Sequence, residues 1–152
     1  MNTNLIFDFG FHNGDDTDFY LKKGFKVIAI EANPHLVSEG ANRFKNIEEL
    51  HLLNKAIHKE PGIVDFYIHP NKSDWGSCLI EVAESDNSKS QRIEVEATTL
   101  EALCQEYGSP HYLKVDVEGC DTLVAEQLAS LELKPSFVSF EISKKNYTGI
   151  FS

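Results

Sequence analysis

The chain has 152 residues, of which 41% are hydrophobic and 25% are charged, and this length and composition predict a single globular domain over residues 1–152. The formal net charge of −10 disfavours nucleic acid and anionic membranes as partners. No apolar run approaches the ~20 residues of a membrane span, and no signal peptide precedes the first predicted strand, so we expect a cytoplasmic protein. Three cysteines without a C-x-x-C pattern disfavour a disulfide framework or a zinc site. Two of them, Cys104 and Cys120, fall on apolar helix faces and are expected to be small core residues.

The stretch over residues 5–34 predicts a strand, a glycine turn, a helix and a second strand. A strand that turns sharply into a helix beside a ligand needs glycine, because a Cβ would block both the backbone angles and the close approach. The first expected strand covers Asn4–Phe7 and ends in Asp8, and the turn that follows is bracketed by Gly10 and Gly14. The expected helix is capped by Asp15 or Asp16, runs to Lys23 and is ended by Gly24. The second strand covers Val27–Ile30 and is followed by Glu31.

This arrangement is typical of a nucleoside site. Glu31 follows Gly10 by about 20 residues, which places its carboxylate to accept hydrogen bonds from ribose hydroxyls. The G-x-x-x-G spacing differs from a dinucleotide fingerprint, and Asp15 and Asp16 at the helix start would repel a phosphate. The same carboxylates suit S-adenosylmethionine, which carries a sulfonium and an amino group but no phosphate. Alternatively, the two aspartates only cap the helix and stabilise its dipole.

The next part of the chain predicts a helix and a third strand. Asn33 and Pro34 provide a cap and a first helical position, and the strand over Leu50–Leu53 leads to Asn54. Because ligands bind at the carboxyl ends of strands in an open sheet, Asn54 is a candidate neighbour of the adenine. The alternative is a polar residue that simply ends the strand.

Alternating apolar residues then predict half-buried strands over residues 64–68 and 93–97. A long polar loop between them contains Trp75, which either covers the ligand site or anchors the loop on the sheet. Thr98 and Glu101 have the spacing of a capping box and predict a helix that Gly108 ends.

The second informative stretch, residues 111–119, predicts a buried fourth strand over Tyr112–Val115. Lys114 is unusual in an apolar strand and must either reach the sheet edge or pair with a carboxylate. Asp116 lies at the same carboxyl edge as Asp8 and Glu31. A fifth strand is expected over Phe137–Phe140, with Glu141 at its end.

Both stretches resemble class I methyltransferases, and specifically the FkbM family. The matching motifs are Asp8-Phe9-Gly10, Gly14, Asp16-Thr17 and Glu31-Ala32-Asn33-Pro34 in the first stretch, and Lys114, Asp116, Glu118 and Gly119 in the second. A departure is Phe11-His12, where many members carry Ala-Asn. The resemblance implies a three-layer, Rossmann-like α/β fold with a mainly parallel sheet. Family members usually continue beyond a fifth strand, so we expect the C-terminal part to be truncated. Either the edge of the fifth strand then pairs with other chains, giving a homo-oligomer, or the chain is part of a longer polypeptide that supplies the remaining strands, which is the outcome we favour.

The implied activity is methyl transfer from S-adenosylmethionine, by resemblance to a hydroxyl on a small molecule or sugar. The expected cofactor-binding residues are Asp8, Gly10, His12, Asn13, Gly14, Asp16, Thr17, Glu31, Ala32, Asn54, Ala56 and Asp116. The expected catalytic residues are Lys114, Asp116 and Glu118; Glu141 and His12 are further candidates for the base that takes the hydroxyl proton. Asp116 and Glu118 alone are weak support for a divalent metal, and we expect none. The alternatives are a non-catalytic nucleoside-binding domain and a nicotinamide-dependent oxidoreductase.

Overall fold

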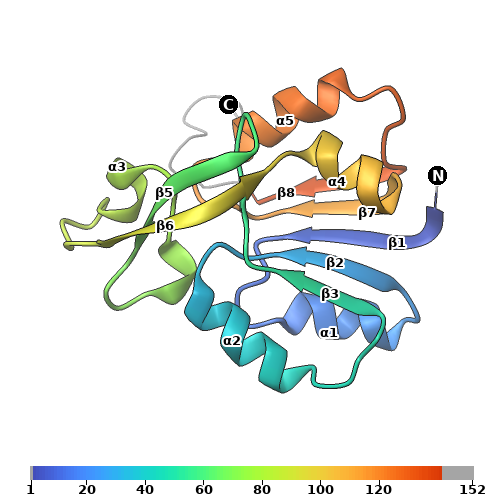
Figure 1. Ribbon diagram of the computed structural model, residues 1–152, viewed down its shortest axis with the longest axis horizontal. Helices are drawn as coiled ribbons and strands as arrows, with labels where there is room; N and C mark the ends of the chain where they lie inside the picture. Colours follow the sequence, from blue (N-terminus) through green and yellow to red (C-terminus); the bar gives the residue numbers. More distant parts are fainter. Residues whose placement is uncertain (1, 142–152) are drawn as a thin grey trace, which may run out of the picture.

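The computed structural model describes residues 2–141, and its centre is a parallel sheet with helices on both faces (Figure 1). The strands of this sheet lie in the order β3-β2-β1-β7-β8, and every neighbouring pair is parallel. Their bounds are β1 (Asn2–Phe9), β2 (Lys26–Ile30), β3 (Leu50–Leu53), β7 (Pro110–Val115) and β8 (Phe137–Phe140). The predicted α/β fold with a mainly parallel sheet is therefore confirmed.

Two helices cover each face of this sheet. In Figure 1, α1 (Asp15–Lys22) and α2 (Pro34–Arg43) lie below the strands, and α4 (Leu100–Tyr107) and α5 (Asp121–Ser130) lie above them. The main buried cluster joins strands to α4 and α5 through residues such as Phe7, Phe9, Leu100, Leu113 and Val124. Burial of such apolar side chains, at about 1.5–3 kcal/mol each, is what holds the layers together.

Two helix caps differ from the sequence prediction by one residue. The N-cap of α1 is Gly14, in a left-handed conformation (φ 87°), so neither Asp15 nor Asp16 caps the helix. A Cβ at Gly14 would lie 2.6 Å from the Phe11 ring, which explains why this position needs glycine. The aspartates occupy the first turn instead, where their charges still favour the helix dipole.

The cap of α4 is Thr99, not Thr98: the Thr99 hydroxyl accepts a hydrogen bond from the Ala102 amide at 3.1 Å. Thr98 is instead the last residue of a strand. The other predicted cap is confirmed, since the Asn33 side chain accepts from the His35 amide at the start of α2.

A second, smaller sheet lies beyond one end of the central strands (Figure 1). It consists of β4 (Ala56–Ile57), β6 (Gln91–Thr98) and β5 (Gly62–Ile68) in that order, with β5 and β6 antiparallel. The polar loop after β5 contains η1 (Ser73–Trp75) and the short helix α3 (Ile80–Ala83). The sequence predicted the strands β5 and β6 but not that they form a separate sheet.

Within residues 2–141, β8 pairs only with β7 and forms one edge of the central sheet. Phe137 on this strand is 61% exposed, whereas Phe140 packs against the main core. The expectation of missing C-terminal strands falls on residues 142–152, which lie outside the described part. Over that described part, none of the helices has the length and apolar character needed to cross a bilayer.

Candidate functional site

The carboxyl ends of β1, β2 and β7 are joined by backbone hydrogen bonds just beyond the strands. The amides of Gly10 and Phe11 both donate to the Ile30 carbonyl, at 3.0 and 3.1 Å, and the Asp116 amide donates to the Phe9 carbonyl at 2.9 Å. Gly10 has φ +89°, and a Cβ there would lie 1.9 Å from the Asp116 carbonyl oxygen. Only glycine satisfies both the backbone angle and this contact.

Beneath this turn, Lys114 and Asp8 form a buried ion pair. The Lys114 Nζ lies 3.0 Å from Asp8 Oδ1, 3.0 Å from the Gly10 carbonyl oxygen and 3.1 Å from Asp16 Oδ2. The Thr17 hydroxyl donates to the other oxygen of Asp8 at 2.6 Å. Lys114 thus pairs with a carboxylate, which is one of the two arrangements that the sequence predicted for it.

Burial raises the pKa of Asp8 above its usual value, although the Lys114 ammonium and the Thr17 hydroxyl oppose this shift. Burial lowers the pKa of Lys114, but the charges of Asp8 and Asp16 and the hydrogen bonds to them together outweigh it and leave the pKa raised. None of the four side chains in this network is among the residues that line the cavities described below. Their contacts hold the glycine turn against β7 and α1.

Glu31, at the end of β2, is buried and uses both carboxylate oxygens. One accepts from the His12 amide at 3.0 Å and the other from the Asn33 amide at 2.9 Å. Burial raises the pKa of Glu31, while these two amides lower it in part. The Asn54 side-chain amide donates to the carbonyls of Glu31 and Ala32, both at 3.0 Å, and so fixes the backbone beside the carboxylate.

Two adjoining spaces open at this end of the sheet. The first, here called the inner cavity, has a volume of about 50 Å³ and is lined by residues that include Gly10, Glu31, Ala32, Ala56, Phe66 and Asp116. The second, here called the outer hollow, measures about 450 Å³ and includes Asn13, Trp75 and Glu141 in its lining. Both are lined by His12, Ser73, Asp116 and Glu118, so the two spaces meet at these side chains.

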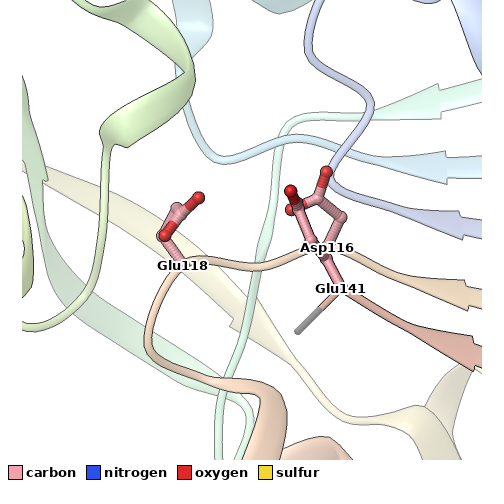
Figure 2. A group of neighbouring side chains, drawn as sticks. All are labelled: Asp116, Glu118 and Glu141. Atoms are coloured by element: carbon pink, nitrogen blue, oxygen red, sulfur yellow. The ribbon is translucent and has the colours of Figure 1, made fainter. Parts of the chain in front are cut away.

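Three carboxylates gather where the two spaces meet. Figure 2 shows Asp116 after β7, Glu141 after β8 and Glu118 in the loop before α5, with their oxygens turned toward a common region. One oxygen from each lies within 4.8 Å of the others, a spacing that a divalent cation could bridge. For a divalent metal the sequence suggested only Asp116 and Glu118; it placed Glu141 at the same edge of the sheet, but as a candidate base.

His12 holds Asp116 from the other side. Its Nε2 lies 3.1 Å from Asp116 Oδ2, and its backbone is left-handed (φ 53°), a conformation that His and Asn adopt more readily than most residues. Burial lowers the pKa of His12, but the hydrogen bond and charge of Asp116 outweigh it, so that the net shift is upward.

The pKa values of Asp116 and Glu141 are shifted in opposite directions. Burial would raise the pKa of Asp116, yet its hydrogen bonds with His12 and Glu141 lower that pKa to about 2. The hydrogen bond to Asp116 raises the pKa of Glu141 to about 7. Near neutral pH, Asp116 is therefore ionised while Glu141 is close to its titration point.

The structure also brings together residues that the sequence did not associate. Cys120 was expected in the core on a helix face, but that was wrong: it precedes α5 and lines the inner cavity together with Cys78. Cys104 does pack against the main core, as predicted. Ser77 is buried, and its hydroxyl donates to the Glu118 carbonyl at 2.6 Å. These contacts join distant parts of the chain, so no local pattern could have signalled them.

Trp75 makes contacts on two sides. It lines the outer hollow, and its ring meets that of His69 edge-on with 5.6 Å between the ring centroids. The Lys72 ammonium lies 3.3 Å from the centre of the same ring. Trp75 thus borders the site from within its own loop.

Comparison with known protein families matches residues 8–150 to the methyltransferase FkbM domain. Searches of curated proteins and of solved structures returned no match. The matched range includes the glycine turn, Glu31 and the three carboxylates, and it spans nearly the whole chain. The chain therefore belongs to the FkbM methyltransferase family.

Proposed function

We propose that this methyltransferase uses S-adenosylmethionine as its methyl donor and binds it in the inner cavity. Glu31 supplies a carboxylate beside apolar residues such as Ala56 and Phe66, a combination that suits ribose hydroxyls next to an adenine ring. The neighbouring carboxylates suit the positive charges of the sulfonium and the amino group. When bound, S-adenosylmethionine supplies an electrophilic methyl group.

The observation that carries this proposal is the junction between the two spaces. The inner cavity and the outer hollow share His12, Ser73, Asp116 and Glu118 in their linings. A methyl acceptor must approach in line with the transferred group, so a donor space and an acceptor space have to meet. In this chain they meet at side chains that can also accept a proton.

We propose further that the acceptor is a hydroxyl of a small polar molecule, such as a sugar. The outer hollow is rich in polar and acidic side chains, among them Asn13, Glu39 and Glu141, which can accept hydrogen bonds from several hydroxyls. Glu141, with a pKa of about 7, is matched to taking a proton near neutral pH. His12 holds Asp116 ionised beside it.

Calorimetric titration tests the donor. We expect S-adenosylhomocysteine to bind the 152-residue chain and NADH to show no heat of binding. Binding of NADH alone, or of neither compound, would refute the proposed cofactor.

A turnover assay tests the acceptor. Radiolabelled S-adenosylmethionine should label hydroxyl compounds such as monosaccharides but not matched compounds whose only nucleophile is an amine. Glu141→Gln should lower kcat, whereas Glu48→Gln, which changes an exposed acidic residue outside both spaces, should leave kcat unchanged. Equal loss in both variants would argue against a specific role for Glu141.

A further inference from the structure

Cys78 and Cys120 both line the wall of the inner cavity. Each thiol changes the pKa of the other, which places the two sulfurs near one another. Both side chains are half-buried and line the cavity, so a small reagent that enters the cavity can reach them.

The two segments that carry these thiols are held together by other contacts as well. The Ser77 hydroxyl donates to the Glu118 carbonyl at 2.6 Å. A Cβ at Gly119 would lie 2.9 Å from Val82 Cγ2 and 3.3 Å from Ser77 Oγ, which shows how closely the backbone packs there. The proximity of the thiols is thus built into the fold by the contacts of their neighbours.

The surroundings of the two thiols differ in a way that favours reaction. Cys120 occupies the N-cap position of α5, where the helix dipole favours a negative sulfur. A thiolate next to a second thiol is the arrangement found in redox-sensing cysteine pairs.

We propose that Cys78 and Cys120 form a reversible disulfide when the protein meets hydrogen peroxide, and that this bridge locks the inner cavity. The Cys120 thiolate attacks peroxide, so that an S–O bond forms, the O–O bond breaks, and the departing hydroxide takes a proton to become water. The Cys78 sulfur then attacks the sulfenic sulfur of Cys120: the S–S bond forms, the S–O bond breaks, and the second water leaves with the Cys78 proton. Two thiols lose two electrons, and one peroxide is reduced to two waters.

The consequence for ligand binding rests on the proposed function. The inner cavity measures about 50 Å³, whereas pockets that bury small ligands are typically about 300–1,000 Å³. Admission of an adenosine group therefore requires the wall formed by Gly76, Ser77 and Cys78 to move away from the Asp116–Cys120 side. A disulfide of about 2.05 Å between the sulfurs would tether these two walls.

The test uses the full 152-residue chain treated with hydrogen peroxide. Intact mass should fall by about 2 Da for the two thiol hydrogens, peptide mapping should find Cys78 linked to Cys120, and dithiothreitol should reverse both changes. Cys104→Ser, the matched control, should still form the bridge, and Cys78→Ser should stop at a sulfenic acid that dimedone traps on Cys120. No mass loss, or a link that involves Cys104, would overturn the proposal.

Calorimetry with S-adenosylhomocysteine tests the locking. We expect the oxidised protein to bind about tenfold or more weakly than the reduced protein, with full recovery after dithiothreitol and no change on peroxide treatment of Cys78→Ser. Equal affinity before and after bridging would overturn the locking. If neither form binds the ligand, the proposed cofactor fails, while the mass and mapping results still decide whether the bridge forms.

Discussion

Replacement of Lys114 by methionine removes the only cation that contacts Asp8 in the described part of the chain. Methionine keeps the length and apolar stem of the side chain but not the ammonium, which lies 3.0 Å from both Asp8 Oδ1 and the Gly10 carbonyl oxygen. Asp8 is 0% exposed and would retain the Thr17 hydroxyl as a partner. The substitution therefore leaves a buried carboxylate without its counter-charge.

The folding free energy that Lys114→Met is expected to lose follows from the burial of Asp8. Removal of one partner from a buried ion pair costs about 3–5 kcal/mol of folding free energy, because the remaining charge stays desolvated. Asp8 can limit that cost by taking up a proton, since burial already raises its pKa. A carboxyl whose folded pKa lies above its unfolded value stabilises the fold at low pH and loses that contribution as pH rises. The loss of folding free energy in Lys114→Met should thus be smallest in acid and largest at neutral pH.

Urea unfolding of wild type and variant at several pH values measures this difference. Lys22→Met is the control: Lys22 is exposed and pairs with Asp18 at 2.6 Å on the helix surface, so its loss should cost less than about 1 kcal/mol. If Lys114→Met costs no more than the control but abolishes methyl transfer, our reasoning is refuted and Lys114 acts directly in catalysis.

Four further results are expected. Gly10→Ala should both destabilise the fold and abolish binding of S-adenosylhomocysteine, because its Cβ would lie 1.9 Å from the Asp116 carbonyl oxygen; a variant with normal melting and affinity would contradict this contact. Glu31→Gln should weaken S-adenosylhomocysteine by about 1.5–3 kcal/mol in a calorimetric titration, the range for hydrogen bonds to a charged group, and unchanged affinity in the folded variant would exclude Glu31 from the ribose site. The rate of methyl transfer should rise with pH through about 7, because Glu141 must lose its proton to act as a base; Glu141→Gln should lose that inflection, and an unaltered profile would assign the base elsewhere. Because Phe137 is 61% exposed on β8, which is an edge strand within residues 2–141, the chain should self-associate in sedimentation experiments and Phe137→Lys should reduce this, whereas a monomer at all concentrations would count against the edge as an interface.

The sequence alone was sufficient for the parts of the protein that depend on local chemistry. The five central strands and the turn at Gly10 were predicted because apolar runs and glycine requirements are properties of short segments. Pairing of Lys114 with a carboxylate was one of two predicted outcomes, since a lysine in a buried strand has few alternatives. The caps of α1 and α4 were each displaced by one residue, because neighbouring Gly and Asp, or two adjacent Thr, are nearly equivalent in a local pattern. The roles assigned to the site residues stay predictions.

Only the tertiary structure shows which distant segments of the chain meet around the site. Nothing in the local pattern of residues 56–98 shows that β4, β5 and β6 form a separate sheet, because strand pairing depends on the packing of distant segments. The sequence placed Glu141 at the same edge of the sheet as Asp116 and Glu118, but only the parallel pairing of β8 with β7 brings an oxygen of each carboxylate within 4.8 Å of the others. Cys78 and Cys120 meet only because the loop after β5 packs against the loop before α5. In each case the contact joins segments remote in sequence, and such contacts are set by the burial of the whole core, which no short stretch of the chain encodes.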